Sequence, residues 1–165
     1  MKIALIAGGF SKKGGVSRYV VELAERFVRK YEVHLITSDY SYYIPNLTVH
    51  IRPMISKPFW LRILANSYFA TKYSKKIKEK FKIDVIHSND DCLFCDIVTM
   101  HSCYKAWINH YKSWGWLQYI RGLIDLSDII ALPMEKRILE KGSKKIIAVS
   151  EGVKRELLEN YNVPE

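Results

Sequence analysis

The sequence predicts an α/β fold, with an open parallel sheet of about six or seven strands and helices on both of its faces. Segments with the pattern of strands alternate along the chain with segments that have the pattern of helices. Several of the strand-like segments are continuous runs of Ile and Val, which is typical of strands buried on both faces. At 165 residues the chain has the length of one domain, so we expect residues 1–165 to form a single unit.

The beginning of the chain has the pattern of a strand, a glycine loop and a helix. A short apolar run, Ile3 to Ile6, ends at Gly8-Gly9. Four apolar residues then recur at spacings of four, three and four, namely Val16, Val20, Leu23 and Phe27. The period therefore changes from that of a buried strand to that of an amphipathic helix.

The glycine loop of this unit suggests an anion site. Backbone N–H groups and the positive end of the dipole at a helix start favour an anion, and Gly14-Gly15 would let a phosphate or sugar approach the main chain without an intervening Cβ. The spacing fits neither the G-x-G-x-x-G fingerprint nor a P-loop, which needs Lys at the position of Gly15. The loop alone also fits a flexible surface turn.

Further strands and a long helix are expected in the middle of the chain. The strand-like runs cover residues 32–38, 47–51, 83–87, 97–101 and 145–149. The segment 59–81 has helical apolar spacing, at Leu61, Leu64, Tyr68, Ile77 and Phe81. Only about nine residues separate the strands at 83–87 and 97–101, too few for a crossover helix. We therefore expect a short, irregular link between them.

The last part of the chain is expected to hold three helices. One covers about 104–126. Pro133 suits the first turn of another, which runs through Leu139 and is closed by Gly142. Ser150 is expected to cap a final helix that ends at about residue 161. The order of all these elements predicts a Rossmann-like sheet.

Polar residues follow several of the expected strands. In open parallel sheets, ligands bind beyond the carboxyl ends of the strands. This rule places four sets of residues along one rim: Gly14-Gly15, Ser88 to Asp91, His101 and Ser150-Glu151. His87 and His101 both end strands, and a structural role is the alternative for either.

The chain is basic, with a formal net charge of +9. Such a charge fits nucleic acid, an anionic membrane surface or phosphorylated substrates. Six lysines crowd the end of the helix expected at 59–81, where they suit the helix dipole and a solvated face: Lys72, Lys75, Lys76, Lys78, Lys80 and Lys82. Nucleic acid is not expected as a partner, because the aromatic and basic residues follow no RNA- or DNA-binding motif.

The cysteines predict a reducing compartment. Their number is three, and an odd count in a chain of this size argues against a disulfide scaffold. Cys92-x-x-Cys95 could form a zinc site with His101 and Cys103, or a redox pair by itself. We expect neither, because His101-x-Cys103 is too tight for a usual zinc site and no helix follows the pair. Buried, apolar roles for Cys92 and Cys95, with no metal, are expected instead.

Four motifs resemble a known family in their order and spacing: Lys13–Arg18, Asp84–His87, Thr99–His101 and Ile146–Leu157. Together they are similar to the N-terminal half of family-four glycosyltransferases of the GT-B fold, over nearly the whole chain. A looser similarity, at Cys95-Asp-Ile97, Trp107, Glu135 and residues 153–164, is to the lipopolysaccharide-core glucosyltransferases.

The resemblance implies half of a retaining glycosyltransferase. In this family the N-terminal domain binds the acceptor, a glycan or a lipid-linked glycan, and the C-terminal domain holds the nucleotide-sugar donor. The reaction needs no metal or other cofactor. The basic pair and paired glutamates of the second domain are expected to be absent from this chain, so that it should not turn over alone. A non-catalytic domain that binds nucleotide or nucleic acid is the alternative.

The resemblance also implies roles for single residues. Gly14 and Gly15 would lie against the donor diphosphate and sugar, where backbone donors stabilise the charge of the leaving group. Arg18 would assist with phosphate or acceptor charge, and His101 would contact the transferred sugar as the catalytic residue. For the acceptor we expect a set of residues on the rim: Asn89, Asp90, Asp91, Ser150 and Glu151. A plain turn is the alternative for the first three, because Asn and Asp are common in turns.

An aromatic stretch at 104–119 interleaves Trp and Tyr with Lys105, Lys112 and, just beyond it, Arg121. It fits the packing of an amphipathic helix. It also fits an anionic bilayer surface, which would suit a lipid-borne acceptor. The sequence contains no run of 18 apolar residues, so it predicts no membrane-spanning helix. The expected location is therefore the cytoplasm, with peripheral contact to the inner face of the membrane.

Overall fold

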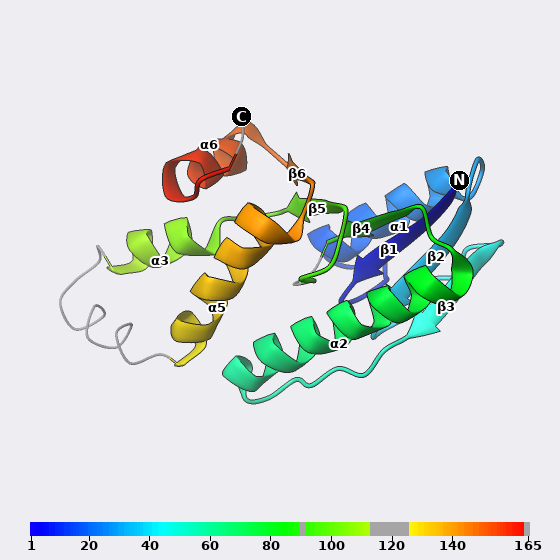
Figure 1. Ribbon diagram of the computed structural model, residues 1–165, viewed down its shortest axis with the longest axis horizontal. Coiled ribbons are helices and arrows are strands. Elements are labelled where there is room, and N and C mark those ends of the chain that lie inside the picture. The colour runs from blue at the N-terminus through cyan, green and yellow to red at the C-terminus, as the bar shows by residue number, and fades with distance from the viewer. Residues whose placement is uncertain (90–91, 113–125, 164–165) are drawn as a thin grey trace.

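Six parallel strands form one sheet in the computed structural model, which describes residues 1–89, 92–112 and 126–163 (Figure 1). The order across the sheet is β3-β2-β1-β4-β5-β6, and each neighbouring pair is parallel. The strands are β1 (Lys2–Ala7), β2 (Glu32–Thr37), β3 (Leu47–Ile51), β4 (Val85–Ser88), β5 (Ile97–Met100) and β6 (Lys145–Ala148). The predicted open parallel sheet is thus confirmed.

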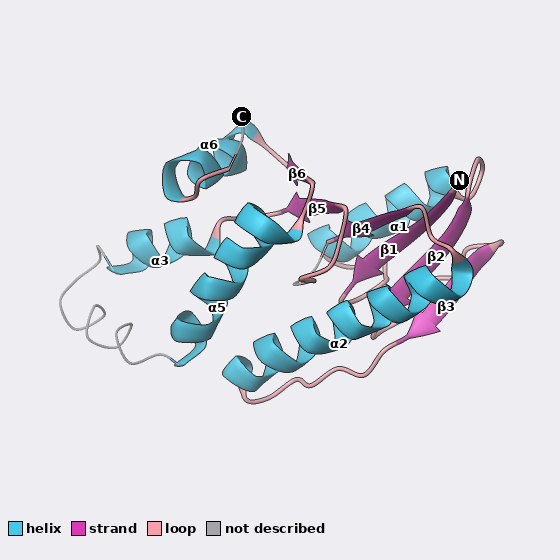
Figure 2. Cartoon of the chain, in the orientation of Figure 1, coloured by secondary structure: helices cyan, strands magenta, loops and turns pink. Residues whose placement is uncertain are grey.

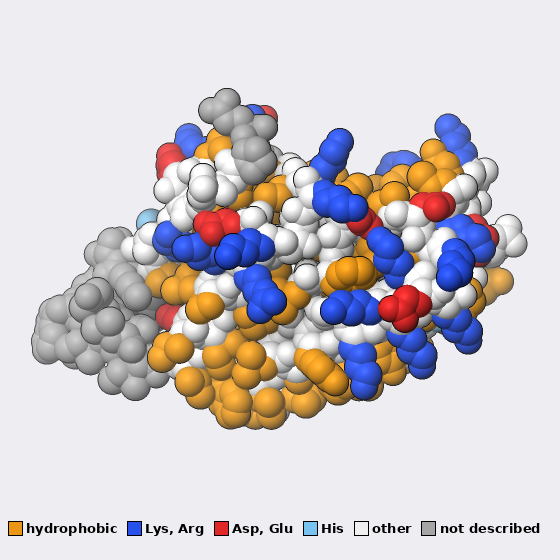
Figure 3. All heavy atoms as spheres, in the orientation of Figure 1, with side chains coloured by type: hydrophobic (Ala, Val, Ile, Leu, Met, Phe, Trp, Pro, Cys, Tyr) orange, Lys and Arg blue, Asp and Glu red, His pale blue; other side chains and the backbone are white. Residues whose placement is uncertain are grey.

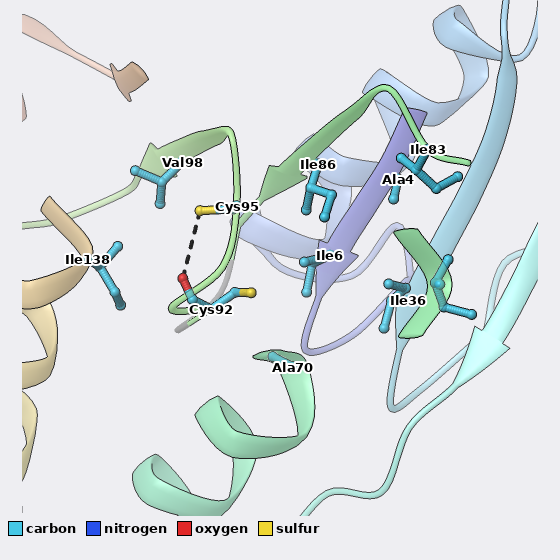
Figure 4. Packing of buried hydrophobic residues seen from close by; sticks show 11 residues of the cluster. Ala4, Ile6, Ile36, Ala70, Ile83, Ile86, Cys92, Cys95, Val98 and Ile138 are labelled. Carbon is cyan, nitrogen blue, oxygen red and sulfur yellow. Dashed lines mark hydrogen bonds between the residues drawn. The ribbon is translucent and has the colours of Figure 1, made fainter. Parts of the chain in front are cut away.

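Helices α1 (Gly15–Phe27) and α2 (Phe59–Phe81) cover opposite faces of this sheet (Figure 2). Successive side chains of a strand point to opposite faces, and β1 serves both layers. Ile3 and Leu5 pack in the cluster that contains the buried face of α1, whereas Ala4 and Ile6 pack in the cluster that contains Ala70 of α2 (Figure 4). The central strand is therefore apolar on both sides, as its continuous run of apolar residues predicts.

In the described residues beyond β5, the structure has three helices and one π-helical turn. They are α3 (Tyr104–Lys112), α5 (Leu126–Arg137), the turn η1 (Ile138–Gly142) and α6 (Glu151–Asn160). Their shared core consists of Cys103, Leu139, Leu157 and Tyr161. This cluster fixes α6 and η1 beside β5 and β6, which form the other end of the sheet from β3.

The apolar positions of α2 do not all face the sheet. Leu64 and Tyr68 are exposed, whereas Ile77 is buried. The residues that do face the sheet are mostly small: Ile63, Ser67, Ala70, Ser74 and Ile77. Small side chains let the helix lie close to the sheet, and the Ser74 hydroxyl is satisfied by donating to the carbonyl oxygen of Ala70 at 2.7 Å.

The expected start of the helix around Pro133 is wrong, whereas its expected end near Leu139 and Gly142 agrees with η1. The helix begins at Leu126, so Pro133 lies inside it and not in its first turn. Proline lacks the N–H that would bond to the carbonyl of Ile129, but Pro133 and Ile129 are both exposed, which lets water reach this side of the helix. Of the helix expected at 104–126, α3 accounts for 104–112, and 113–125 lie outside the described residues.

The link between β4 and β5 is short, and residues 92–96 within it form no helix, as predicted. Cys92 and Cys95 are buried in the α2-side cluster, where the Cys95 thiol donates to the Cys92 carbonyl oxygen at 3.7 Å (Figure 4). Burial raises the pKa of Cys95 to about 12, so its reactive thiolate form is suppressed. The buried, apolar role predicted for both cysteines is confirmed.

Two further findings concern metal and membrane. Within residues 1–89, 92–112 and 126–163, no group of three or more His, Cys, Asp or Glu side chains is arranged to hold a metal ion. In the same ranges, no helix has both the length and the apolar character needed to cross a bilayer.

Candidate functional site

A cavity of about 420 Å³ lies at the carboxyl ends of the central strands. Gly8 follows β1, Asn89 follows β4 and His101 follows β5, and all three line it. The start of α2 and the middle of α5 supply the other walls. This is the position that the strand-end rule predicts for a ligand.

His101 presents a ring nitrogen without a partner to this cavity. Its Nε2 is buried and has no hydrogen bond within the described part of the chain. The ring packs edge-on against Tyr19 of α1, with ring centroids 5.2 Å apart. Burial lowers the pKa of His101, so the neutral form is favoured near pH 7. A neutral Nε2 can donate or accept a hydrogen bond, depending on the tautomer.

Asn89 is the second polar group that the cavity leaves unsatisfied. The residue is 8% exposed, and its backbone N–H donates to the carbonyl oxygen of Ile6 at 2.9 Å, which extends the pairing of β4 with β1. Both the Nδ2 and the Oδ1 of its side chain lack partners in the described residues. Because a buried, unpaired amide is costly, this side chain is poised for a ligand that both donates and accepts, as a sugar hydroxyl does.

Two arginines supply positive charge on the wall formed by β3 and α2, and neither was predicted. Arg52 follows β3 and is only 2% exposed. Its backbone N–H donates to the carbonyl oxygen of Thr37 at 2.8 Å, and its Nη1 donates to that of Asn66 at 3.5 Å. Arg62, in the first turn of α2, stacks over the ring of Phe59 at 4.3 Å. The strand-end rule, applied to β3, would have found Arg52.

Glu135 of α5 is the one acidic side chain among the described residues that line the cavity. Its carboxylate accepts hydrogen bonds from the backbone N–H groups of Tyr104 at 2.7 Å and Lys105 at 3.1 Å. It also accepts one from the hydroxyl of Tyr161. The group therefore caps the start of α3, three residues after His101, and its negative charge is taken up by these contacts.

The glycine loop stands next to the cavity. Gly14 has a φ of 82°, and Gly15 begins α1. A Cβ added to either would meet nothing within 4 Å, and both glycines are exposed. The next residue, Val16, lines the cavity. No side chain caps this helix start, so its first N–H groups remain open to an anion.

The loop is anchored on the side away from the cavity. The N–H of Phe10 donates to the carbonyl oxygen of Asp39 at 2.9 Å, and Phe10 stacks on Tyr40. Lys12 pairs with Glu25 at 3.1 Å and lies over the ring of Tyr42 at 4.3 Å. These contacts hold in place the backbone that would face a donor. The contacts of Lys12 with Glu25 and Tyr42 are part of this anchoring.

The structure does not bring all the predicted site residues together. Arg18 is exposed, is not among the lining residues and lies 4.0 Å from Glu22 of the same helix. Ser150 and Glu151 line a separate cavity of about 550 Å³ between β6 and α6. Asp90 and Asp91 lie outside the described residues.

The end of α5 and the turn η1 lie between the two cavities. Glu135 and Ile138 line the one that contains His101, whereas Leu139 and Glu140 line the other. Ser150 has a structural role, because its Oγ accepts a hydrogen bond from the N–H of Val153 at 3.2 Å and caps α6 as predicted. The strand-end rule does not place Ser150 beside His101, because consecutive residues of η1, Ile138 and Leu139, line different cavities.

His87 has a structural role as well. Its Nε2 lies 2.7 Å from the Thr99 hydroxyl in the neighbouring strand, and the residue is buried. Burial lowers its pKa to about 4, and it does not line the cavity.

Comparisons with known proteins found a family model and similar solved structures. A family model described as Glycosyltransferase Family 4 matches residues 13–165. Among solved structures, WaaG, a glycosyltransferase involved in lipopolysaccharide biosynthesis, aligns with a TM-score of 0.78 at 14% identity, over 98% of this chain and 42% of that chain. A glycosyltransferase from Rickettsia africae aligns with a TM-score of 0.49 at 17% identity, over 99% of this chain and 40% of that one. No curated protein matches the chain.

Proposed function

Since the chain belongs to glycosyltransferase family 4 and has the fold of the N-terminal domain of GT-B enzymes, we propose that it is the acceptor-binding half of a retaining glycosyltransferase. The sugar, a hexose, would pass from a nucleotide-sugar to a glycan or lipid-linked acceptor. The observation that carries this proposal is the pair of buried, unpartnered side chains, Asn89 and His101, in one cavity at the strand ends.

The two side chains suit an acceptor hydroxyl and the transferred sugar. The Asn89 amide offers a donor and an acceptor, as recognition of a hydroxyl group requires. The neutral His101 ring offers Nε2 for a hydroxyl of the transferred sugar. Fixed groups of this kind hold the two reactants in register, which is where much of the rate of a transfer reaction originates.

The glycine loop suits the donor. Gly14 and Gly15 expose the start of α1 without side chains, and its N–H groups would stabilise the charge that develops on the leaving diphosphate.

Residues 1–165 span 42% of the length of the WaaG chain. We propose that a second, donor-binding domain is needed for turnover, and that residues 1–165 alone are inactive. No metal or cofactor takes part in this proposal.

The proposed location is the cytoplasmic face of a membrane. Hydrophobic side chains gather over the first half of α2, where Phe59, Leu64 and Tyr68 are exposed, and Lys and Arg side chains gather over its second half (Figure 3). In α3, Trp107 is 56% exposed, whereas Lys105 donates to the carbonyl oxygen of Asn160 at 2.7 Å. An apolar surface beside lysines suits an anionic bilayer, and flotation with phosphatidylglycerol vesicles tests this association.

The acceptor site is tested by titrating the ¹⁵N-labelled chain with methyl glucoside, methyl mannoside and methyl galactoside. At least one should shift the amide signals of Asn89 and His101. Asn89→Ala and His101→Ala should each weaken that binding about tenfold, the effect of about 1.4 kcal/mol from one lost hydrogen bond. Asn162→Ala, at an exposed asparagine of the other cavity, is the matched control. Shifts confined to Ser150 and Glu151 would contradict the assignment.

A further inference from the structure

The backbone around His101 is anchored on both sides, but the Nε2 atom of its ring is not. Strand β5 ends one residue earlier, where the carbonyl oxygen of Met100 accepts a hydrogen bond from the N–H of Val149 at 3.2 Å. Three residues later, the Glu135 carboxylate accepts one from the N–H of Tyr104. No hydrogen bond reaches Nε2 within the described residues. Another contact is therefore needed to set the orientation of the ring.

Tyr19 of α1 makes a contact of this kind. Its ring meets the His101 ring edge-on, with centroids 5.2 Å apart and planes inclined by 81°. Aromatic rings attract each other in this arrangement and prefer a defined geometry. The outer side-chain torsion of a histidine is broad and roughly two-fold, so an imidazole without such a neighbour can turn over. The Tyr19 ring restricts this freedom.

Tyr19 is itself held in place. It is half-buried and packs against the cluster that contains the buried face of α1. In the helix it follows Gly15 by four residues and Val16 by three, and Val16 lines the cavity. Residues at these spacings share one face of a helix. The face of α1 that begins at the glycine loop therefore also carries the ring that touches His101.

We infer that Tyr19 is a positioning residue, whose ring holds the His101 imidazole in the orientation that contacts the transferred sugar. The inference rests on the proposed function and adds to it a residue outside the cavity, since Tyr19 is not among the described residues that line it. Tyr19 would thus act through His101 and not by touching the sugar. It would also tie the orientation of this ring to the helix that presents the donor loop. A binding group needs such support from neighbouring side chains to keep its geometry.

The His101 ring can be followed by NMR in the intact chain labelled with ¹³C and ¹⁵N. In the wild type, NOEs should connect the ring protons of Tyr19 and His101, and the pKa of His101 should lie below 6.5, because burial lowers it. Tyr19→Leu should reduce this burial, so that the pKa returns toward 6.5 and both neutral tautomers are populated. Tyr19→Phe keeps the ring contact and should match the wild type.

Sugar binding provides the second measurement. The methyl glycoside that binds the wild type should bind Tyr19→Leu about fivefold more weakly, the effect of one lost aromatic pair. The shift at His101 should shrink, whereas the shift at Asn89 should persist. Tyr19→Phe should bind this glycoside as the wild type does.

Tyr31→Leu is the matched control. Tyr31 follows α1 and meets Phe27 edge-on, with ring centroids 6.2 Å apart, so this variant removes the same kind of contact at the far end of the helix. It should leave both the His101 ring and the sugar affinity unchanged. The charged side chains of the described lining are the same in every variant: Arg52, Arg62 and Glu135. A change in the pKa of His101 would therefore report the loss of burial.

The outcomes separate this inference from the proposed function. Absent NOEs in the wild type would overturn it, and this measurement needs no variant, so it decides the contact even if Tyr19→Leu fails to fold. An unchanged His101 ring in Tyr19→Leu, or unchanged sugar affinity, would also overturn it and leave the acceptor site intact. If no methyl glycoside shifts Asn89 or His101 in the wild type, the acceptor site itself is wrong, whatever the His101 ring shows.

Discussion

Glu135 shows how one buried side chain joins three helices around the cavity. It lies on α5, caps the start of α3 and accepts a hydrogen bond from Tyr161 just after α6. Burial and the contact with this carboxylate together raise the pKa of Tyr161 well above its usual range, so the phenol stays protonated and donates. The same carboxylate fixes the segment that leads from His101 into α3.

We therefore expect Glu135→Gln to destabilise the protein by about 2 kcal/mol, because hydrogen bonds to a charged group are lost and a buried donor is left without its acceptor. Urea denaturation measures the free energy of unfolding. Glu159→Gln changes an exposed glutamate of α6 and should stay within about 0.5 kcal/mol of the wild type. Equal effects of the two substitutions would contradict the role assigned to Glu135.

Sequence patterns locate single residues of the cavity only where a strand end is followed by a polar group. Asn89 and His101 were found in this way, and the structure brings them to one cavity. Arg52 obeys the same rule but belongs to no motif, so it was missed. Ser150 obeys the rule as well, yet it faces a different cavity, because the path of η1 depends on tertiary packing that local sequence does not encode.

At the scale of elements, the two glycines of the loop allow two requirements to be tested separately: a positive φ at Gly14, and close approach of a ligand at Gly15. Gly14 has positive φ, whereas Gly15 has ordinary helical geometry at the start of α1, and a Cβ would meet nothing at either position. Gly14→Ala should cost about 1 kcal/mol of stability, because an L residue is disfavoured at this φ. Gly15→Ala should leave the stability unchanged or raise it by a few tenths of a kcal/mol, since Ala favours helix.

The two variants also test close approach of the donor. If a diphosphate lies against the loop, Gly15→Ala should weaken the binding of pyrophosphate although the protein is fully stable. NMR titration measures this binding, and urea denaturation measures the stability of both variants. Equal stability of Gly14→Ala and Gly15→Ala would show that the positive φ is not required, and unchanged pyrophosphate binding in Gly15→Ala would remove the loop from the donor site.

Element types were easier to predict than the faces of those elements. The period-two and continuous apolar runs located all six strands, because a strand buried on both faces needs apolar residues throughout. In α2, the larger apolar residues Leu64 and Tyr68 are exposed, and small residues such as Ala70 and Ser74 pack against the sheet. Side-chain size, which governs how closely two layers approach, outweighed hydrophobicity there.

At the scale of the whole molecule, one buried and one half-buried histidine, His87 and His50, should make the fold sensitive to mild acid. Burial lowers the pKa of His87 to about 4. The pKa of His50 is also about 4, mainly through burial and also through His34 and Lys80. In the unfolded chain both return to about 6.5. Between these values the unfolded chain binds more protons than the folded one, so stability must fall as the pH is lowered through this window.

We expect the free energy of unfolding to decrease between pH 7 and pH 4.5, with His87 contributing on the order of 2 kcal/mol. Burial opposes a lower pKa at Asp96, but contacts with Lys144, the Ile86 N–H and Lys78 outweigh it and lower the pKa from 3.8. The stability that Asp96 contributes is therefore lost only below this pH window. Urea denaturation at several pH values measures the slope. His87→Gln should flatten it, whereas His110→Gln, at an exposed histidine of α3, should leave it as in the wild type. If His87→Gln keeps the full slope, the acid sensitivity arises elsewhere, and the neutral His87–Thr99 contact is not what protons disrupt.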